Sequence, residues 1–136
     1  MPWKIVKSYL LQGKGKGKST PADLLIMMEP ILIITNLPDR AAAMSLAQKL
    51  IDERVAACVN VLAECTSVYH WQGKNESTTE VPVLVKTLAR HYGRVEELIT
   101  SLHPYELPEI IAVPISNGLP AYLNWIAGET STPDNN

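Results

Sequence analysis

The feature that most constrains the fold of this 136-residue chain is the order of its hydrophobic patterns. Along the chain, the spacing of apolar residues changes from that of a strand to that of a helix and back again, and this happens twice. Apolar, mostly β-branched residues run without a break from Ile31 to Thr35, which indicates a buried strand. From Asp39 the pattern becomes that of a helix with one apolar face, and residues 55–61 and 66–71 return to strand character. The first half of the chain therefore predicts a strand, a helix and a further strand.

A long hairpin follows this first unit. Residues 72–75, Gln-Gly-Lys-Asn, have turn chemistry, and beyond them Val81, Val83 and Val85 occupy alternate positions. The two arms therefore pair over many residues. Pro82 lies within this pattern, so we expect it at an edge, a bulge or a gap in the ladder.

The second unit repeats the order of the first. A second amphipathic helix ends at Pro104, because proline lacks an N–H and disfavours the helical conformation in the residue before it. Residues 110–115 form the last predicted strand, in which Pro114 again requires irregular pairing. Pro120 is suited to the first position of a short final helix, which we expect Gly128 to end.

The resulting order, β-α-β-β-α-β, predicts an α+β protein with a ferredoxin-like sandwich, a long hairpin between its second and third strands and a short C-terminal helix. Right-handed crossovers leave few alternative topologies. The two helices cover one face of the sheet. We expect the other face to carry apolar residues and to drive self-association; these residues are Val59, Val61, Val68 and Leu84.

Residues 1–27 differ in composition from the rest of the chain. They hold five lysines and one aspartate, whereas residues 28–136 hold seven basic and thirteen acidic residues. Glycine and lysine alternate through the end of this segment, which does not favour a packed core. We therefore expect a flexible basic leader at 1–27, a folded domain at 28–128 and a polar tail at 129–136. The leader is open to three interpretations: a flexible tail, an added extension or an organelle-targeting peptide.

Composition also disfavours several classes of function. The domain is acidic and repels phosphate backbones, so nucleic acid is not an expected partner. Its apolar runs are shorter than the ~20 residues that span a bilayer, so no membrane partner is expected either. Cys58 and Cys65 make no C-x2-C pair, which indicates neither a disulfide framework nor a zinc knuckle and favours a reducing, cytoplasmic compartment. No nucleophile stands beside a base in a recognised pattern, so we do not expect an enzyme.

The segment from His103 to Ile110 holds a histidine, a tyrosine and two carboxylates between the second helix and the last strand. His103 has two interpretations. In one, its imidazole lies in the last helical turn and complements the helix dipole and the unpaired carbonyl groups. In the other, it binds a metal ion. A single imidazole does not hold Cu(II) or Zn(II) tightly, so a metal site at His103 would be weak and would need ligands from another subunit.

Taken together, six ordered segments between about residues 29 and 126 resemble the CutA family of divalent-cation tolerance proteins. They are Asn36–Asp39, Ala56–Asn60, Ser67–Lys74, Val85–Thr87, His103–Tyr105 with Pro108–Ile110, and Tyr122–Trp125. The resemblance implies a ferredoxin-like protomer assembled as a tight homotrimer through its long hairpins, similar to the signalling protein PII. It also implies a role in tolerance to copper and other divalent metals, without a reaction firmly attached to the family.

The resemblance carries over only part of the proposed copper site. In members proposed to bind copper, a cysteine follows the first strand and a His-His pair precedes Pro-Tyr. Here those positions hold Thr35 and Leu102, which leaves His103 as the metal-site residue.

A cleft for a small ligand is the second site hypothesis, and its residues are Lys86, Trp71, Tyr105 and Glu109. A buried Lys86 would need a carboxylate partner, for which Glu109 is the candidate, and the pair would bind a small anion between subunits. The alternative is that these charges and Trp71 are contacts between subunits.

Three functional hypotheses follow. The first is a homotrimeric divalent metal-ion response or tolerance protein, which acts by binding copper or another divalent cation and not by catalysis. The second is a PII-like sensor that takes a small anionic metabolite at the cleft between subunits. The third is a trimeric scaffold that presents a surface to another protein.

Overall fold

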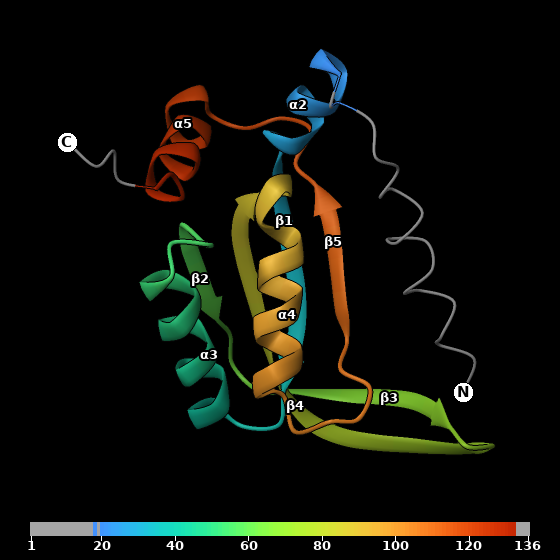
Figure 1. Cartoon of the computed structure of the whole chain (residues 1–136). Coiled ribbons are helices and arrows are strands. Elements are labelled where there is room, and N and C mark those ends of the chain that lie inside the picture. Colours follow the sequence, from blue (N-terminus) through green and yellow to red (C-terminus); the bar gives the residue numbers. More distant parts are fainter. Residues whose placement is uncertain (1–17, 19, 133–136) are drawn as a thin grey trace.

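The computed structural model describes residue 18 and residues 20–132, so most of the predicted leader and the last four residues of the tail lie outside the described part of the chain. The elements are α2 (Pro21–Met27), β1 (Pro30–Leu37), α3 (Arg40–Asp52), β2 (Cys58–Val61), β3 (Cys65–Trp71), β4 (Lys74–Leu88), the 3-10 helix η1 (Ala89–His91), α4 (Tyr92–Leu102), β5 (Ile110–Pro114) and α5 (Pro120–Glu129). Figure 1 shows their arrangement. The predicted α+β order is confirmed.

Three details differ from the prediction. The strand expected from residue 55 begins only at Cys58, and α5 continues through Gly128 to Glu129. The sequence pattern also gave no sign of α2, which lies within the predicted leader. Thr20 caps this helix, accepting a hydrogen bond from the backbone N–H of Asp23, and none of its residues is buried.

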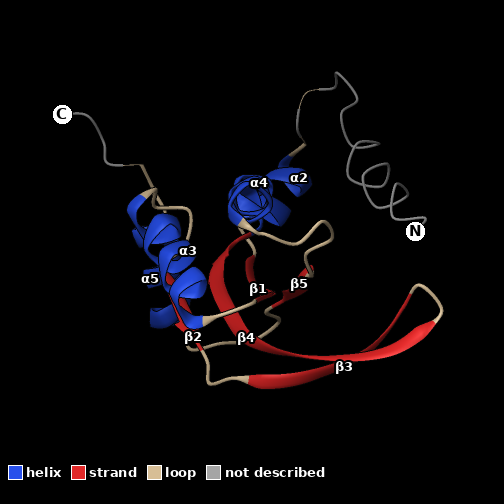
Figure 2. Ribbon diagram, turned by 90° about the horizontal axis from the view of Figure 1, so that it is seen from below, coloured by secondary structure: helices blue, strands red, loops and turns tan. Residues whose placement is uncertain are grey.

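The sheet has the order β2-β4-β1-β5, and all of these neighbours are antiparallel. The 15-residue strand β4 pairs with β2 through residues 83–86 and with β3 through residues 74–80. Pro82 lies between these two stretches, as its missing N–H requires. Gln72 and Gly73 connect β3 and β4 with φ of 49° and 79°, the positive values of a two-residue hairpin turn. Figure 2 shows this hairpin extending well beyond the body of the domain.

The core lies between one face of the sheet and the helices α3 and α4. Asp39 caps α3 by accepting a hydrogen bond from the backbone N–H of Ala42 at 2.8 Å. Helix α3 then buries every third or fourth residue, and α4 does the same. The core residues they contribute are Ala43, Leu46, Leu50, Val95, Leu98 and Ile99, which meet Ile31, Ile33, Leu37, Val81, Val83 and Val85 of the sheet. Each large aliphatic side chain buried there contributes about 2 kcal/mol through the hydrophobic effect.

The expectation that Val59 and Val61 lie on the uncovered face was wrong. In β2 they lie opposite Val85 and Val83, and both pack against the core. Residues directly opposite each other in an antiparallel pair point to the same face of the sheet, so the register places these two valines under the helices.

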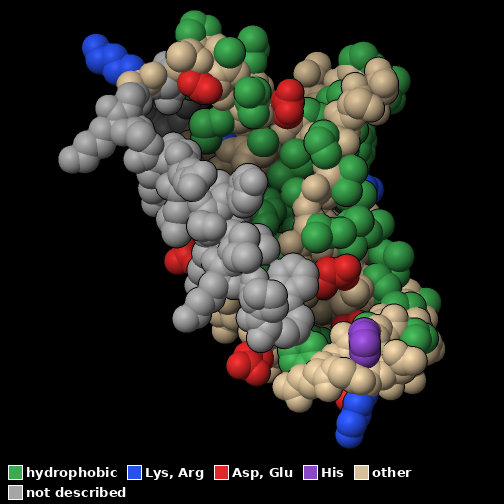
Figure 3. Space-filling model, turned by 90° about the vertical axis from the view of Figure 1, so that its right-hand side faces the viewer, with side chains coloured by type: hydrophobic (Ala, Val, Ile, Leu, Met, Phe, Trp, Pro, Cys, Tyr) green, Lys and Arg blue, Asp and Glu red, His purple; other side chains and the backbone are tan. Residues whose placement is uncertain are grey.

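The uncovered face is nevertheless apolar. Ile34 lies opposite Leu84 on one side and Ile111 on the other. Ile111 and Val113 of β5 expose 48% and 44% of their surface, and Val68 of the hairpin exposes 77%. Figure 3 looks onto the β5 side of the molecule and shows hydrophobic side chains gathered there. The expectation of an exposed apolar surface thus holds, with partly different residues.

Candidate functional site: an acidic, aromatic cleft beside the hairpin

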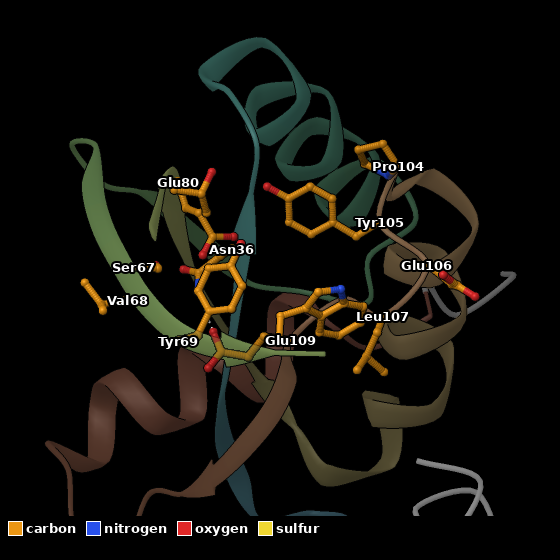
Figure 4. Close-up of a pocket in the computed structure, with 12 residues that line it drawn as sticks. Asn36, Ser67, Val68, Tyr69, Glu80, Pro104, Tyr105, Glu106, Leu107 and Glu109 are labelled. Carbon is orange, nitrogen blue, oxygen red and sulfur yellow. Dashed lines mark hydrogen bonds between the residues drawn. The ribbon is translucent and has the colours of Figure 1, made fainter. Parts of the chain in front are cut away.

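A cleft of about 660 Å³ lies between the β3–β4 hairpin and the loop that connects α4 to β5. Figure 4 shows the side chains around it. Three aromatic residues and two carboxylates dominate the lining: Tyr69, Trp71 and Tyr105, with Glu80 and Glu109; Glu106 also borders the cleft. None of the residues that line it in the described part of the chain is Lys or Arg. The cleft is therefore acidic as well as aromatic.

The end of β1 brings these parts together. Asn36 lies opposite Pro82 of β4, two residues after Glu80, and its neighbour Thr35 lies opposite Ile110, the residue after Glu109. Glutamates that are 29 positions apart in the sequence thus flank one end of a central strand. The Asn36 side-chain amide donates a hydrogen bond of 2.5 Å to Glu109 Oε2. One carboxylate of the cleft therefore already has a hydrogen-bond donor.

His103 holds the α4–β5 loop against β1. It is the C-cap of α4, with extended backbone angles (φ −82°, ψ 131°) as expected for a residue before proline. Its Nε2 lies 2.6 Å from the carbonyl oxygen of Asn36, and the backbone N–H of Tyr105 donates to its Nδ1 at 3.1 Å. Because Nδ1 accepts, Nε2 must carry the proton and donate. The interpretation that its imidazole complements the carbonyl groups of its own helix was wrong, since it bonds to a strand.

These contacts bear on the metal hypothesis for His103. The side chain is buried, and both ring nitrogens are engaged. A neutral imidazole binds a metal through its unprotonated nitrogen, which here is the nitrogen that accepts from Tyr105. His103 would therefore have to give up that hydrogen bond to become a ligand.

Tyr105 extends from the loop into the cleft. Its ring stacks at a tilt on the His103 imidazole, with the centroids 4.7 Å apart. Figure 4 shows its hydroxyl group pointing across the cleft toward Glu80. Burial raises the pKa of Tyr105 first, and the negative charge of Glu80 raises it further. The hydroxyl therefore stays protonated at neutral pH and can donate a hydrogen bond.

Glu80 is the most constrained carboxylate of the site. It lies on β4 opposite Cys65 and exposes only 9% of its surface, yet it lines the cleft. Within residues 18 and 20–132, no side chain or backbone group forms a hydrogen bond or ion pair with its carboxylate. Sequence reasoning did not select Glu80, because its burial depends on the hairpin and the α4–β5 loop meeting. Figure 4, by contrast, shows Glu106 pointing away from the cleft.

Three of the four predicted cleft residues, Trp71, Tyr105 and Glu109, line this cleft, but Lys86 does not. Lys86 lies opposite Leu32, four residues along β1 from Asn36, which is about 13 Å at the rise of a strand. Its Nζ lies 5.9 Å from the centre of the Tyr122 ring on α5. The predicted Lys86–Glu109 pair is therefore not formed within one subunit.

Among the residues that the structure describes, no group of three or more His, Cys, Asp or Glu side chains is arranged to hold a metal ion. Cys58 and Cys65 are both free thiols, on β2 and β3. They lie opposite Lys86 and Glu80, six residues apart on β4 or about 20 Å. The described helices are too short or too polar to cross a bilayer.

Comparison with known proteins places the chain in a family. The family model of the CutA1 divalent ion tolerance protein matches residues 31–129. The divalent-cation tolerance protein CutA of Thermus thermophilus is 41% identical over 103 residues, which cover 76% of this chain and 99% of that protein. The protein CutA of Mus musculus is 38% identical over 98 residues, which cover 72% of this chain and 55% of the mouse protein.

Solved structures agree with these matches. The crystal structure of CutA from Xylella fastidiosa is 45% identical, with a TM-score of 0.74, and the match covers 76% of this chain and 99% of that one. A periplasmic divalent cation tolerance protein CutA from Archaeoglobus fulgidus is 32% identical, with a TM-score of 0.73 and coverages of 75% and 99%. In sequence and in fold, this chain belongs to the CutA1 family of divalent ion tolerance proteins.

Proposed function

We propose that this protein binds copper or another divalent cation in the acidic cleft and so takes part in the response or tolerance to metal ions, without catalysing a reaction. The carrying observation is Glu80, a residue that exposes only 9% of its surface, lines the cleft and has no hydrogen-bond or ion-pair partner among the described residues. A carboxylate charge in such a recess is favoured by a positively charged partner, so the cleft favours a cation. The names of the relatives, which are divalent-cation tolerance proteins, support the same class of ligand.

The ligands available in one subunit make this binding weak. Glu80 and Glu109 supply carboxylate oxygens, which suit a divalent cation that keeps part of its water shell. A tight site would need a third protein ligand from another subunit. His103 can add a nitrogen ligand only by giving up its hydrogen bond with Tyr105.

Homotrimer assembly is part of this proposal. The apolar uncovered face, with Ile111 and Val113, supports self-association because such a surface is costly to leave in water. The outer edge of β3 is unpaired along the described hairpin, which gives a second surface for a neighbouring copy. The two free thiols support a reducing compartment, and we place the protein in the cytoplasm.

The alternative of a small anionic metabolite has less support. Lys86, which was to hold the anion, lies at the other end of β1, and the carboxylates of the cleft repel an anion. An anion site would need a lysine or arginine from a second subunit at this cleft.

The experiment is calorimetric titration of the metal-stripped full chain with Cu(II), Zn(II) and Ni(II). Glu80→Gln removes the charge and keeps the shape, so we expect at least a tenfold loss of affinity for the metal that binds best. Glu106→Gln makes the same charge change where the side chain points away, and should stay within twofold. Equal metal affinities of the two variants would show that the metal does not bind at Glu80 in the cleft. No metal uptake by the native chain would refute the proposal.

A further inference from the structure

We propose that the cleft also takes an organic ammonium ion, whose charged nitrogen pairs with Glu80 and whose carbon body lies against Tyr69, Trp71 and Tyr105. This inference rests on the proposed function only in that both require a cation at Glu80. It differs in the chemical class of that cation.

The first step of the argument is the state of Glu80. The residue exposes only 9% of its surface and lines the cleft, and its carboxylate has no hydrogen-bond or ion-pair partner among the described residues. Its oxygens are not among the fully buried unpartnered atoms, so a ligand in the cleft can reach them. A carboxylate has several lone pairs to satisfy, and N–H donors that carry a positive charge satisfy them best. Glu109 differs, because the Asn36 amide already donates to it. Of these two carboxylates, Glu80 is thus the one that lacks a hydrogen-bond donor in the described part of the chain.

The second step concerns the walls. Aromatic rings do not ligate divalent metal ions, but their faces attract ammonium ions and their surfaces bury carbon chains. Three rings on two different elements, the hairpin and the α4–β5 loop, line this one cleft together with Val68 and Leu107. A metal ion would use the carboxylates and leave these walls without a role. An organic cation uses both.

The third step concerns size and protonation. A volume of about 660 Å³ lies within the range of sites for small organic molecules. Tyr105 stays neutral, so its hydroxyl group adds no second negative charge across the cleft from Glu80. His103 fixes the loop that carries Tyr105 through its bonds to Asn36 and to the Tyr105 backbone. The wall opposite Glu80 is therefore set in place before a ligand arrives.

The test uses the metal-stripped full chain, labelled with ¹⁵N and titrated with pentylammonium chloride while its amide and indole N–H signals are followed by NMR. The neutral control ligand is 1-pentanol, which has the same carbon body. We expect saturable binding of pentylammonium with shifts at the hairpin and at residues 104–109, and at least tenfold weaker binding of 1-pentanol. Glu80→Gln should lose at least tenfold in affinity for pentylammonium, whereas Glu106→Gln should stay within twofold.

Equal binding of the two ligands, unchanged binding by Glu80→Gln, or no saturable binding would each overturn the inference. No saturable binding is the result expected if a neighbouring copy fills the cleft. If Glu80→Gln does not fold, Trp71→Leu takes its place and should weaken pentylammonium binding at least threefold. The metal titration separates the two proposals: metal uptake without pentylammonium binding rejects this inference alone, and pentylammonium binding without metal uptake supports it and rejects the metal.

Discussion

Replacing His103 with alanine tests whether this residue is a structural anchor or a metal ligand. The change removes two hydrogen bonds, one to the carbonyl of Asn36 and one from the backbone N–H of Tyr105. Each contributes about 1 kcal/mol, and a partner left buried without a bond costs about 1–3 kcal/mol more. Some of that cost is recovered by water at the part-buried loop, so we expect a loss of about 2–4 kcal/mol in the free energy of unfolding. At about 5 °C per kcal/mol for a domain of this size, the Tm falls by ~10–20 °C.

The assay is thermal and urea unfolding of the metal-free chain at one fixed protein concentration, because the proposed assembly would make the Tm depend on concentration. Two further variants divide the effect. His103→Asn places an oxygen near the Nδ1 position and keeps an acceptor for Tyr105, and His103→Gln places an amide near Nε2 and keeps a donor for Asn36. Each should lose about half as much stability as alanine. A His103→Ala variant with an unchanged Tm and a weakened Cu(II) affinity would refute this reasoning and make His103 a ligand.

Three further predictions concern stability. Thr87 Oγ1 donates to the carbonyl of Val55 at 2.6 Å in the core, whereas Thr35 Oγ1 is buried without a partner among the described residues. Thr87→Val should therefore lose about 1–2 kcal/mol in urea unfolding, while Thr35→Val should be neutral or gain up to about 1 kcal/mol; equal losses would contradict this. Asp39→Ala removes the cap of α3 and should cost about 1 kcal/mol in the same assay, whereas Asp39→Asn should lose less than half of that. A hydrogen bond from Arg94 holds the pKa of Glu53 in the folded protein below its ordinary value. The ionised Glu53 therefore stabilises the fold at any pH above the pKa that this group has in the unfolded chain. That stabilisation is lost as the pH falls through the lower pKa of the folded protein. In Glu53→Gln, the Tm should therefore decrease less steeply below about pH 4. The same decrease of Tm with falling pH as in the native chain would contradict the role given to Glu53.

The fold could be predicted from the sequence where local signals are strong. Asp39 marks the start of α3 and Pro104 fixes the end of α4, because a capping side chain and a missing N–H act within one helical turn. The turn at Gln72 and Gly73 is equally local. The faces of Val59 and Val61 were mistaken because a short strand does not reveal its register, and a shift of one residue exchanges the two faces.

The site was predictable only in part for a similar reason. Trp71, Tyr105 and Glu109 were selected because aromatic and acidic residues cluster near turns. The cleft itself requires the hairpin and the α4–β5 loop to meet at the end of β1, which no local pattern specifies. The burial of Glu80 depends on that meeting, and the separation of Lys86 from Glu109 follows from the register of β4 and β5 against β1.

The central claim is that an assembly of this chain takes up a divalent cation at the Glu80 cleft. Native mass spectrometry of the metal-stripped full chain, titrated with Cu(II), Zn(II) and Ni(II), tests it most directly. We predict a trimer that gains one ion of the preferred metal per subunit, an uptake that Glu106→Gln retains and Glu80→Gln loses. A trimer that stays bare, or one that loads equally in both variants, would contradict the account.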